Sequence, residues 1–519
     1  MKYKVYKIFK YICVFTIFVY CNKPSTAFAS LFRSHSQVFA DSIQQGFLFD
    51  IDDSLLKASR PDLSIKPFRK SSKYNNRTYS HIQKYSFSPN DSSKHNYLII
   101  TTFSLIDSLS KEIRTYAEDV HAIYGYGVYV EATENATPEQ LKSLIVSYQN
   151  KLCGVIFIGS LGEAFFETDN DYGRYGYTYW PCDLYFMDLD GNWVDNDGNG
   201  IYDEHTGNQA PDIFFGRLSG EGLSIIGTEV DLIRMQLHKS HSFWWNSSYN
   251  VADTTLNYVY LDWIFEHIPN YPALVFQGAK YDDVRMNMNL SYSATDYKSR
   301  LNQSKYGFTH LAVHSSSFTH DFLDNSSNPY VEVVDILGNN SQNIAYNLFC
   351  CSACNWTGAS CYGYLGGAYL FNQGKTIAVI GSTKTGGMKS IRNFYINITS
   401  STNIGDSFLR WWKSTYGEQH VLNDIYWSYG MTILGDPTLN TKYKVRNQCE
   451  TSLNLLTFPT DNYSNLILYK AAKEMRVSKD FSIPPGVHVI FDAPKVLFEP
   501  GFSCQVGSTF ETRCEGCEL

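Results

Sequence analysis

The 519-residue sequence lacks features that would assign it to several common classes of protein. Beyond the N-terminus it has no Lys/Arg cluster, and its formal net charge of -8 argues against nucleic-acid binding. The pattern His-Glu-x-x-His is missing, which argues against a catalytic zinc site of that type. No repeat of fixed period is visible. With 44% apolar residues, a chain of this length is expected to form about two to four folded units.

The chain also lacks an apolar run long enough to cross a bilayer, which takes about 20 residues. Its N-terminal run "YICVFTIFVY" has ten residues, follows four lysines and precedes Ala27-Phe28-Ala29, a small-x-small cleavage site. We therefore predict a signal peptide at 1–29 and an exported protein that is secreted, periplasmic or on the cell surface. Lipid attachment at Cys21 is the alternative, although the bulky Tyr20 before it disfavours that modification.

Eight of the twelve cysteines gather in two places. Four lie at 350–361, and four more are Cys449, Cys504, Cys514 and Cys517. Because export permits disulfides, we interpret the C-terminal set as a disulfide-stapled tail. The set at 350–361 lies in a buried-strand pattern and needs another explanation.

Strand and helix patterns alternate from Tyr97 onward. The segments "YLIITTF", "VYVEA" and "CGVIFIGSL" have the apolar character of buried strands, and helical patterns lie between them. The alternation returns in "NYVYLDW", "ALVFQG", "FTHLAVH", "AYNLFCCSA" and "TIAVIGS". This order is typical of α/β folds with parallel sheets. We predict a polar leader or pro-segment at 30–95, α/β subdomains at 96–250 and 251–443, and a small all-β C-terminal module at 444–519.

Two residues at the ends of predicted strands could form a catalytic dyad. Cys354 follows "AYNLFCCSA" and His314 ends "FTHLAVH", and ligands gather at the carboxyl ends of parallel strands. An imidazole there can deprotonate a thiol, and the thiolate is the nucleophile. Cys350 and Cys351 fall within the predicted strand, where a thiol acts as a small apolar side chain. From spacing alone, a structural histidine and a packing cysteine are the commoner interpretations.

Six segments, taken in order, resemble the gingipain family of secreted bacterial cysteine peptidases, which have a caspase-like fold. They are "VIFIGS", "PDIFFGRLS", "HLAVHSSS", "SACNWTG", "KTIAVIGST" and "ILGDPTL". The resemblance implies caspase-like parallel sheets flanked by helices in two subdomains, and a cysteine endopeptidase that acts on protein or peptide substrates. It implies Cys354 as the nucleophile and His314 as the base. It also implies Ser315 and Cys354 as the oxyanion N–H donors and Asp262 as the acidic residue that orients the histidine.

Two departures from the family pattern leave other functions open. Ser315 stands where the family usually has glycine, and "ACNWTG" is one residue longer than the family's segment. One alternative is a catalytically inactive, calcium-stabilised surface binding protein. Another is a transpeptidase that serves protein export and passes the acyl group to an amine.

The acidic stretch "DLDGNWVDNDGNGIYDEHTG" at 188–207 follows the first half of a calcium-binding loop. The expected ligands are Asp195, Asp197, Asn199, the carbonyl of Ile201, Asp203 and Glu204. Thr206 stands where such a loop usually has a bidentate Glu. We predict structural calcium here and no organic cofactor, with an unliganded Asx-rich turn as the alternative.

The tail "VIFDAPKVLFEPGFSCQVGSTFETRC" resembles a short β segment at the C-termini of many exported proteins of the Bacteroidetes group, through Pro500-Gly501-Phe502 and Gly507-Ser508. The resemblance implies association with the cell surface or the export machinery. At the other end, we expect the leader to cover the active-site cleft until it is cut before Tyr97.

Overall fold

A computed structural model describes the protein at residues 79–89, 95–245, 254–259, 285–288, 293–303, 306–324, 326–357, 363–398, 401–418, 422–440, 450–458, 466–514 and 516–517. The chain divides into two compact units, Met1–Ala58 and Ser59–Leu519. The predicted signal peptide and most of the predicted leader lie outside the described residues. Within those residues, no helix is both long enough and apolar enough to cross a membrane.

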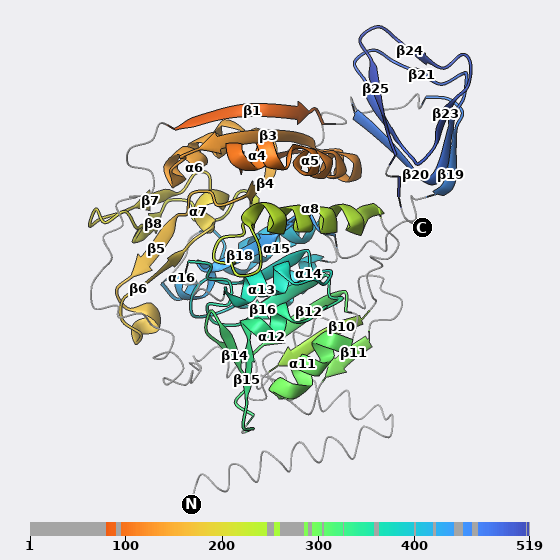
Figure 1. Ribbon diagram of the computed structural model, residues 1–519. Helices are drawn as coiled ribbons and strands as arrows, with labels where there is room; N and C mark the ends of the chain where they lie inside the picture. Colours follow the sequence, from red (N-terminus) through yellow and green to blue (C-terminus); the bar gives the residue numbers. More distant parts are fainter. Residues whose placement is uncertain are drawn as a thin grey trace, which may run out of the picture. The chain divides into compact units, whose positions relative to one another are not determined.

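A mixed sheet of eleven strands dominates the described part of the unit Ser59–Leu519 (Figure 1). In spatial order the strands are β1 (Ser80–Phe87), β3 (Gly127–Glu134), β2 (Asn96–Thr102), β4 (Leu152–Ile158), β9 (Phe214–Leu218), β18 (Met431–Gly435), β17 (Ala378–Ser382), β16 (Ala345–Phe349), β12 (Phe308–Ala312), β10 (Thr254–Val259) and β11 (Arg285–Met288). Neighbouring strands are parallel except that β1 is antiparallel to β3 and β17 to β18. Two parallel blocks of opposite direction therefore join between β18 and β17.

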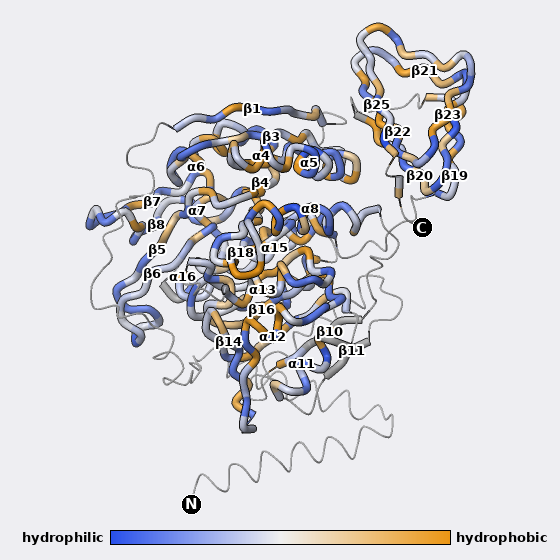
Figure 2. The backbone as a smooth tube through the Cα atoms, in the orientation of Figure 1, coloured by the Kyte–Doolittle hydropathy of each residue, from blue (hydrophilic) through white to orange (hydrophobic). Residues whose placement is uncertain are grey.

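Helices connect and flank the strands, as the alternating pattern predicts. They are α4 (Phe103–Ser108), α5 (Ser110–Tyr124), α6 (Pro138–Ser147), α7 (Leu184–Met187), α8 (Glu229–Trp245), α11 (Ala294–Gln303), α12 (Val333–Leu337), α13 (Leu365–Phe371), α14 (Ile391–Ile398), α15 (Ile404–Tyr416) and α16 (Leu422–Ser428). The helix α6 begins with a capping box between Thr137 and Gln140. Figure 2 shows hydrophobic residues along the central strands, and all residues of β12, β16, β17 and β18 are buried. The predicted α/β fold class is confirmed.

The end of the predicted leader is part of the sheet. The strand β1 pairs with β3 along its whole length, from Ser80 opposite Glu134 to Phe87 opposite Val128. Its sequence "SHIQKYSF" is mostly exposed, as suits an edge strand, and this polarity explains why composition alone assigned it to the polar leader or pro-segment. Residues 80–87 are therefore a structural element and not a loose segment.

The predicted all-β C-terminal module is a short β-solenoid. It contains β19 (Glu450–Leu455), β20 (Leu466–Val477), β21 (Ser482–Ile483), β22 (His488–Asp492), β23 (Val496–Phe498), β24 (Ser503–Cys504) and β25 (Thr509–Arg513), all paired in parallel. Ser482 lies opposite Ser503 and His488 opposite Thr509, so equivalent residues of these two rungs are 21 residues apart. The sequence analysis missed this period, although "FSIPPG" and "FSCQVG" begin 21 residues apart.

The thiols of the module differ from the expected disulfide set. Cys504 and Cys514 are free and exposed. Cys449 lies outside the described residues. Cys504 and Cys514 therefore do not contribute to the predicted disulfide-stapled tail, whereas Cys517 is disulfide-bonded.

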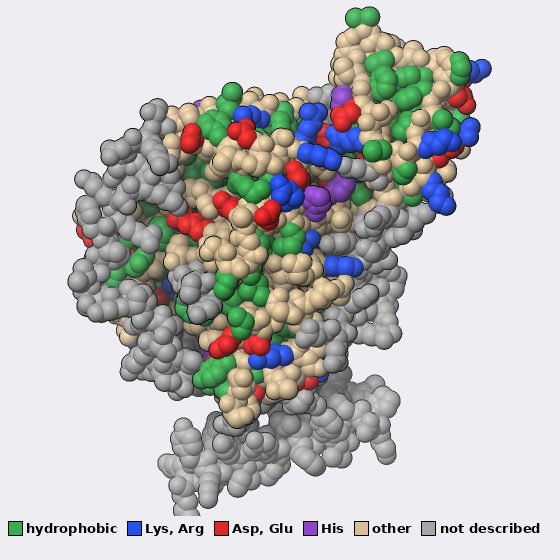
Figure 3. Space-filling view, viewed as in Figure 1, with side chains coloured by type: hydrophobic (Ala, Val, Ile, Leu, Met, Phe, Trp, Pro, Cys, Tyr) green, Lys and Arg blue, Asp and Glu red, His purple; other side chains and the backbone are tan. Residues whose placement is uncertain are grey.

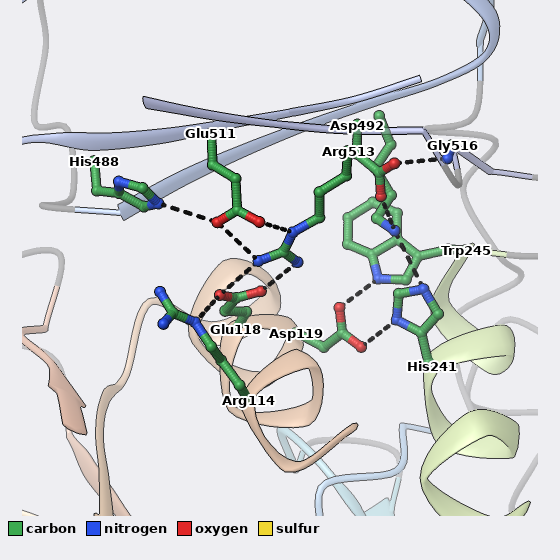
Figure 4. A network of polar contacts seen from close by, with 11 residues as sticks. Arg114, Glu118, Asp119, His241, Trp245, His488, Asp492, Glu511, Arg513 and Gly516 are labelled. Carbon is green, nitrogen blue, oxygen red and sulfur yellow. Dashed lines mark hydrogen bonds and ion pairs between the residues drawn. The ribbon is translucent and has the colours of Figure 1, made fainter. Parts of the chain in front are cut away.

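An ion-pair network joins the module to α5 (Figure 4). Arg513 of β25 donates to both carboxylate oxygens of Glu118, at 2.7 and 3.1 Å. Glu118 also accepts from Arg114 at 2.9 Å, and its side chain is only 1% exposed. Figure 3 shows basic, acidic and His side chains together over α5 and α8. The pairing of Glu118 with Arg513 and Arg114 explains how α5 can carry a buried acidic residue.

A second chain of contacts reaches α8 (Figure 4). Lys470 of β20 pairs with Asp492 at 2.9 Å and lies 3.2 Å from His241 Nε2. Because an ammonium can only donate, His241 Nε2 accepts this bond and Nδ1–H donates to Asp119 at 2.6 Å. Trp245 Nε1 donates to the other oxygen of Asp119 at 2.7 Å. The module is thus joined to the α/β part by polar contacts that are largely buried.

Candidate active site

The register of two adjacent parallel strands determines which residues meet at their carboxyl ends. Ala312 at the end of β12 lies opposite Phe349 at the end of β16. His314 and Cys351 each follow this pair by two residues, so both leave the sheet at the same level. The hydroxyl of Ser315 donates to the carbonyl oxygen of Cys351 at 2.6 Å. The described contacts therefore join the His314 segment to Cys351.

Cys351 is half-buried, whereas Cys350 and Cys354 are buried. Burial raises the pKa of the Cys351 thiol, and Asp171 acts in the same direction, while the Gly386 N–H and the Lys384 ammonium lower it. The next residue, Ser352, has a φ of 55°, a left-handed conformation that a non-glycine residue adopts only under strain. A strained turn directly after a strand end thus places Cys351 beside the Gly386 N–H and Lys384, which favour its thiolate, and beside Asp171, which disfavours it.

The thiol of Cys354, the predicted nucleophile, lies inside the core. The Cys354 N–H donates to Ser382 O at 2.9 Å, which directs the turn back along β17. A Cβ added at Gly366 or Gly381 would lie 2.8 or 2.6 Å from Cys354 Sγ, so the sulfur packs against both glycines. Burial raises the pKa of this thiol well above its ordinary value. Cys354 has the surroundings of a structural cysteine, and its N–H is already used.

Two residues of the predicted site remain, Asp262 and Ser315, and the structure describes only Ser315. Asp262 lies outside the described residues. Ser315 lies in β13 (His314–Ser315) and is not among the residues with positive φ, so serine replaces the family's glycine without strain there. Asp321 of β14 (Thr319–Asp321) is the direct partner of His314 across this antiparallel pair, and it is buried. Sequence reasoning missed Asp321 because the pairing depends on a hairpin that no turn pattern indicated.

The predicted calcium loop connects β7 (Asn192–Val194) to β8 (Glu204–Thr206). Asp195 accepts N–H bonds from Gly198, Asn199 and Gly200, so its carboxylate holds the loop itself. Carboxylate oxygens of Asp197, Asp203 and Glu167 lie within 4.8 Å of one another. These hard oxygen ligands suit calcium.

Glu167 is the member of this cluster that the sequence analysis missed. It comes from β5 (Phe165–Thr168), which is paired with β6 (Thr178–Pro181), and it is buried. Its carboxylate accepts from Asn199 Nδ2 at 3.1 Å. Asn199 is thus close to the cluster, whereas Glu204 is exposed and accepts from Asn196. No spacing within 188–207 could point to a carboxylate from another hairpin.

Comparison with known proteins decides the family. The family model of Peptidase family C25 matches residues 90–442. The chain belongs to peptidase family C25. The resemblance to the gingipain family is thereby confirmed, and this C25 peptidase is a cysteine peptidase by family.

Solved structures and curated proteins add less about this C25 peptidase. Seven chains of solved structures match, among them one described as "Structure of Protease". That structure has 13% sequence identity and a TM-score of 0.46, and the match covers 70% of this chain and 81% of that chain. The comparison with curated proteins finds no match.

Proposed function

We propose that this C25 peptidase is an endopeptidase whose nucleophile is Cys351 and whose base is His314. The β12–β16 register carries the proposal, since it sets His314 and Cys351 level at the carboxyl ends of neighbouring strands. The burial of the Cys354 thiol favours Cys351 over the residue predicted from sequence. Asp321, the partner of His314 across β13–β14, takes the orienting role that the sequence analysis gave to Asp262.

The proposed chemistry is acyl transfer. His314 takes the thiol proton, and the Cys351 sulfur attacks the scissile carbonyl carbon while the backbone N–H of Ser315 stabilises the oxyanion. The C–N bond then breaks as His314 returns the proton to the leaving amine. Water activated by the same imidazole hydrolyses the thioester and regenerates the thiol. The protein substrate is exported or extracellular in this proposal, since the predicted signal peptide directs the chain out of the cytoplasm.

A thiol-directed peptide inhibitor tests the proposal without any substitution. We expect mass spectrometry to find the label on Cys351 far earlier than on Cys350 or Cys354. First labelling at Cys354 would restore the prediction made from sequence. Equal and slow labelling of all three would favour the inactive binding protein. A cleavage product that carries an added amine would favour the transpeptidase.

We also propose that calcium binds between the β7–β8 loop and Glu167. Chelation is expected to lower the melting temperature, because a ligand at 100 times its Kd stabilises the folded state by about 2.7 kcal/mol. Glu167→Gln combined with Asp197→Asn is expected to abolish the calcium-dependent shift. Glu204→Gln is the matched control in the same stretch and should retain it. A full calcium shift in the double variant would place the ion elsewhere.

A further inference from the structure

A buried ion pair brings together segments that are far apart in the sequence, next to Cys351. Lys384 Nζ lies 2.9 Å from Asp171 Oδ1, and the two side chains are 4% and 1% exposed. The same ammonium donates to the carbonyl oxygens of Thr385 and Tyr426, each at 2.9 Å. Three contacts use all three of its N–H groups. Lys384 therefore connects the short helix η1 (Asp171–Gly173), the turn after β17, and α16.

The turn that Lys384 holds also contacts the Cys351 segment. Ser352 N donates to Lys384 O at 2.8 Å. Gly386 has a φ of 125°, and a Cβ there would lie 2.7 Å from Tyr172 Oη, so the close approach requires glycine. A Cβ at Gly387 would lie 2.8 Å from the ring of Phe349, the last residue of β16. The turn is thus packed against the end of β16, two residues before Cys351.

Tyr172 closes the arrangement on the other side. Its φ of 54° is a strained conformation for tyrosine, and its hydroxyl donates to Tyr426 O at 3.0 Å. The Lys384 ammonium lies 4.7 Å from the Tyr172 ring centre and 4.9 Å from that of Trp180, which favours the charged form of lysine. Burial nonetheless lowers the pKa of Lys384, and Asp171 opposes this effect.

We propose that Lys384 is a positioning residue for the Cys351 thiolate: its ammonium fixes the turn whose Lys384 carbonyl accepts from Ser352 N, directly after Cys351, and offsets the charge of Asp171. This inference rests on the proposed function, in which Cys351 is the nucleophile. Lys384 acts on the sulfur through charge and through the turn, and has no contact with the scissile bond in this proposal. The groups that act electrostatically on Cys351 are Lys384, Asp171, Tyr172 and Cys350, with His314 as its proposed base.

The test is the pH profile of Cys351 alkylation by iodoacetamide, followed by mass spectrometry on the full chain. We expect Lys384→Met to slow alkylation at pH 7 about tenfold and to move the profile to higher pH, since one pKa unit changes the thiolate fraction tenfold. Asp171→Asn removes the opposing charge and is expected to move the profile to lower pH. Lys384→Arg should restore a profile near that of the unmodified protein, and Lys413→Met, at an exposed lysine, should leave it unchanged.

Opposite shifts for Lys384→Met and Asp171→Asn separate electrostatic positioning from mere loosening of the fold, which would move both profiles in one direction. Shifts of the same sign, or an unshifted profile in either variant, would overturn the inference. If Lys384→Met fails to fold, Asp171→Asn still decides: a profile that is unshifted or moves to higher pH overturns the inference. Retained peptide turnover in Cys351→Ala would reject the proposed function itself, and the alkylation profiles do not depend on that result.

Discussion

Replacing Cys351 with alanine is expected to reduce peptide turnover by about 10⁴-fold or more, because losing the nucleophile removes the covalent route entirely. The measurement is hydrolysis of a diverse peptide library by the full chain, with circular dichroism to confirm the fold. Cys351 is half-buried at the end of β16, so the smaller side chain should change stability little.

Cys354→Ala is the matched control for this experiment. We expect it to retain turnover within a few-fold and to lose on the order of 1 kcal/mol or more of stability, since it leaves a small cavity between Gly366 and Gly381. The reverse pattern, with activity lost in Cys354→Ala and kept in Cys351→Ala, would show that the assignment made from sequence was right. An unmodified protein without any turnover would favour the binding-protein alternative.

Arg217→Met is expected to cause a large loss of stability. Arg217 Nη2 lies 2.7 Å from Asp183 Oδ1, and both side chains are 2% exposed. Thr432 Oγ1 also donates to Asp183 at 2.6 Å, so the carboxylate is held between β9 and β18. Removing the guanidinium leaves an unpaired buried charge, which typically costs about 3–5 kcal/mol.

The control for Arg217→Met is Arg410→Met, which breaks an ion pair with Asp406 whose arginine is 50% exposed. Exposed pairs of this kind contribute about 0.5 kcal/mol. Urea unfolding followed by fluorescence compares the two variants. Similar unfolding midpoints for both would mean that the Asp183 carboxylate is neutral or is stabilised without Arg217.

Much of the fold could be predicted from sequence because buried strands and capped helices are local patterns. The strand "AYNLF" and the helix that starts after Thr137 follow from apolar runs and capping chemistry. The polar edge strand β1 could not be predicted, because an edge strand needs few apolar residues. The junction of two oppositely directed blocks at β18 also has no local signal, since strand direction depends on the path of long connections.

The sequence prediction and our proposal share a Cys/His chemistry and differ in the choice of thiol. Three cysteines follow one strand, and sequence alone cannot show where the strand ends: the prediction extended it to Ala353, whereas β16 ends at Phe349. The strand therefore ends two residues before Cys351 and five residues before Cys354. Asp171 and Glu167 were missed for a related reason. Both belong to the long connection between the neighbouring strands β4 and β9, and within it Asp171 reaches Lys384 in the turn after β17.

The 21-residue spacing of the C-terminal rungs restricts how this part of the chain can change in length. Removing 482–502 would bring Ser503 to the position of Ser482 and Thr509 to that of His488, with the same backbone direction and the same inward-facing positions. A one-residue slip of the ladder would instead turn apolar side chains such as Phe491 toward solvent. Insertions and deletions in this module are therefore tolerated as whole rungs. The contact of Arg513 with Glu118 adds a second condition, because the number of rungs must keep β25 against α5.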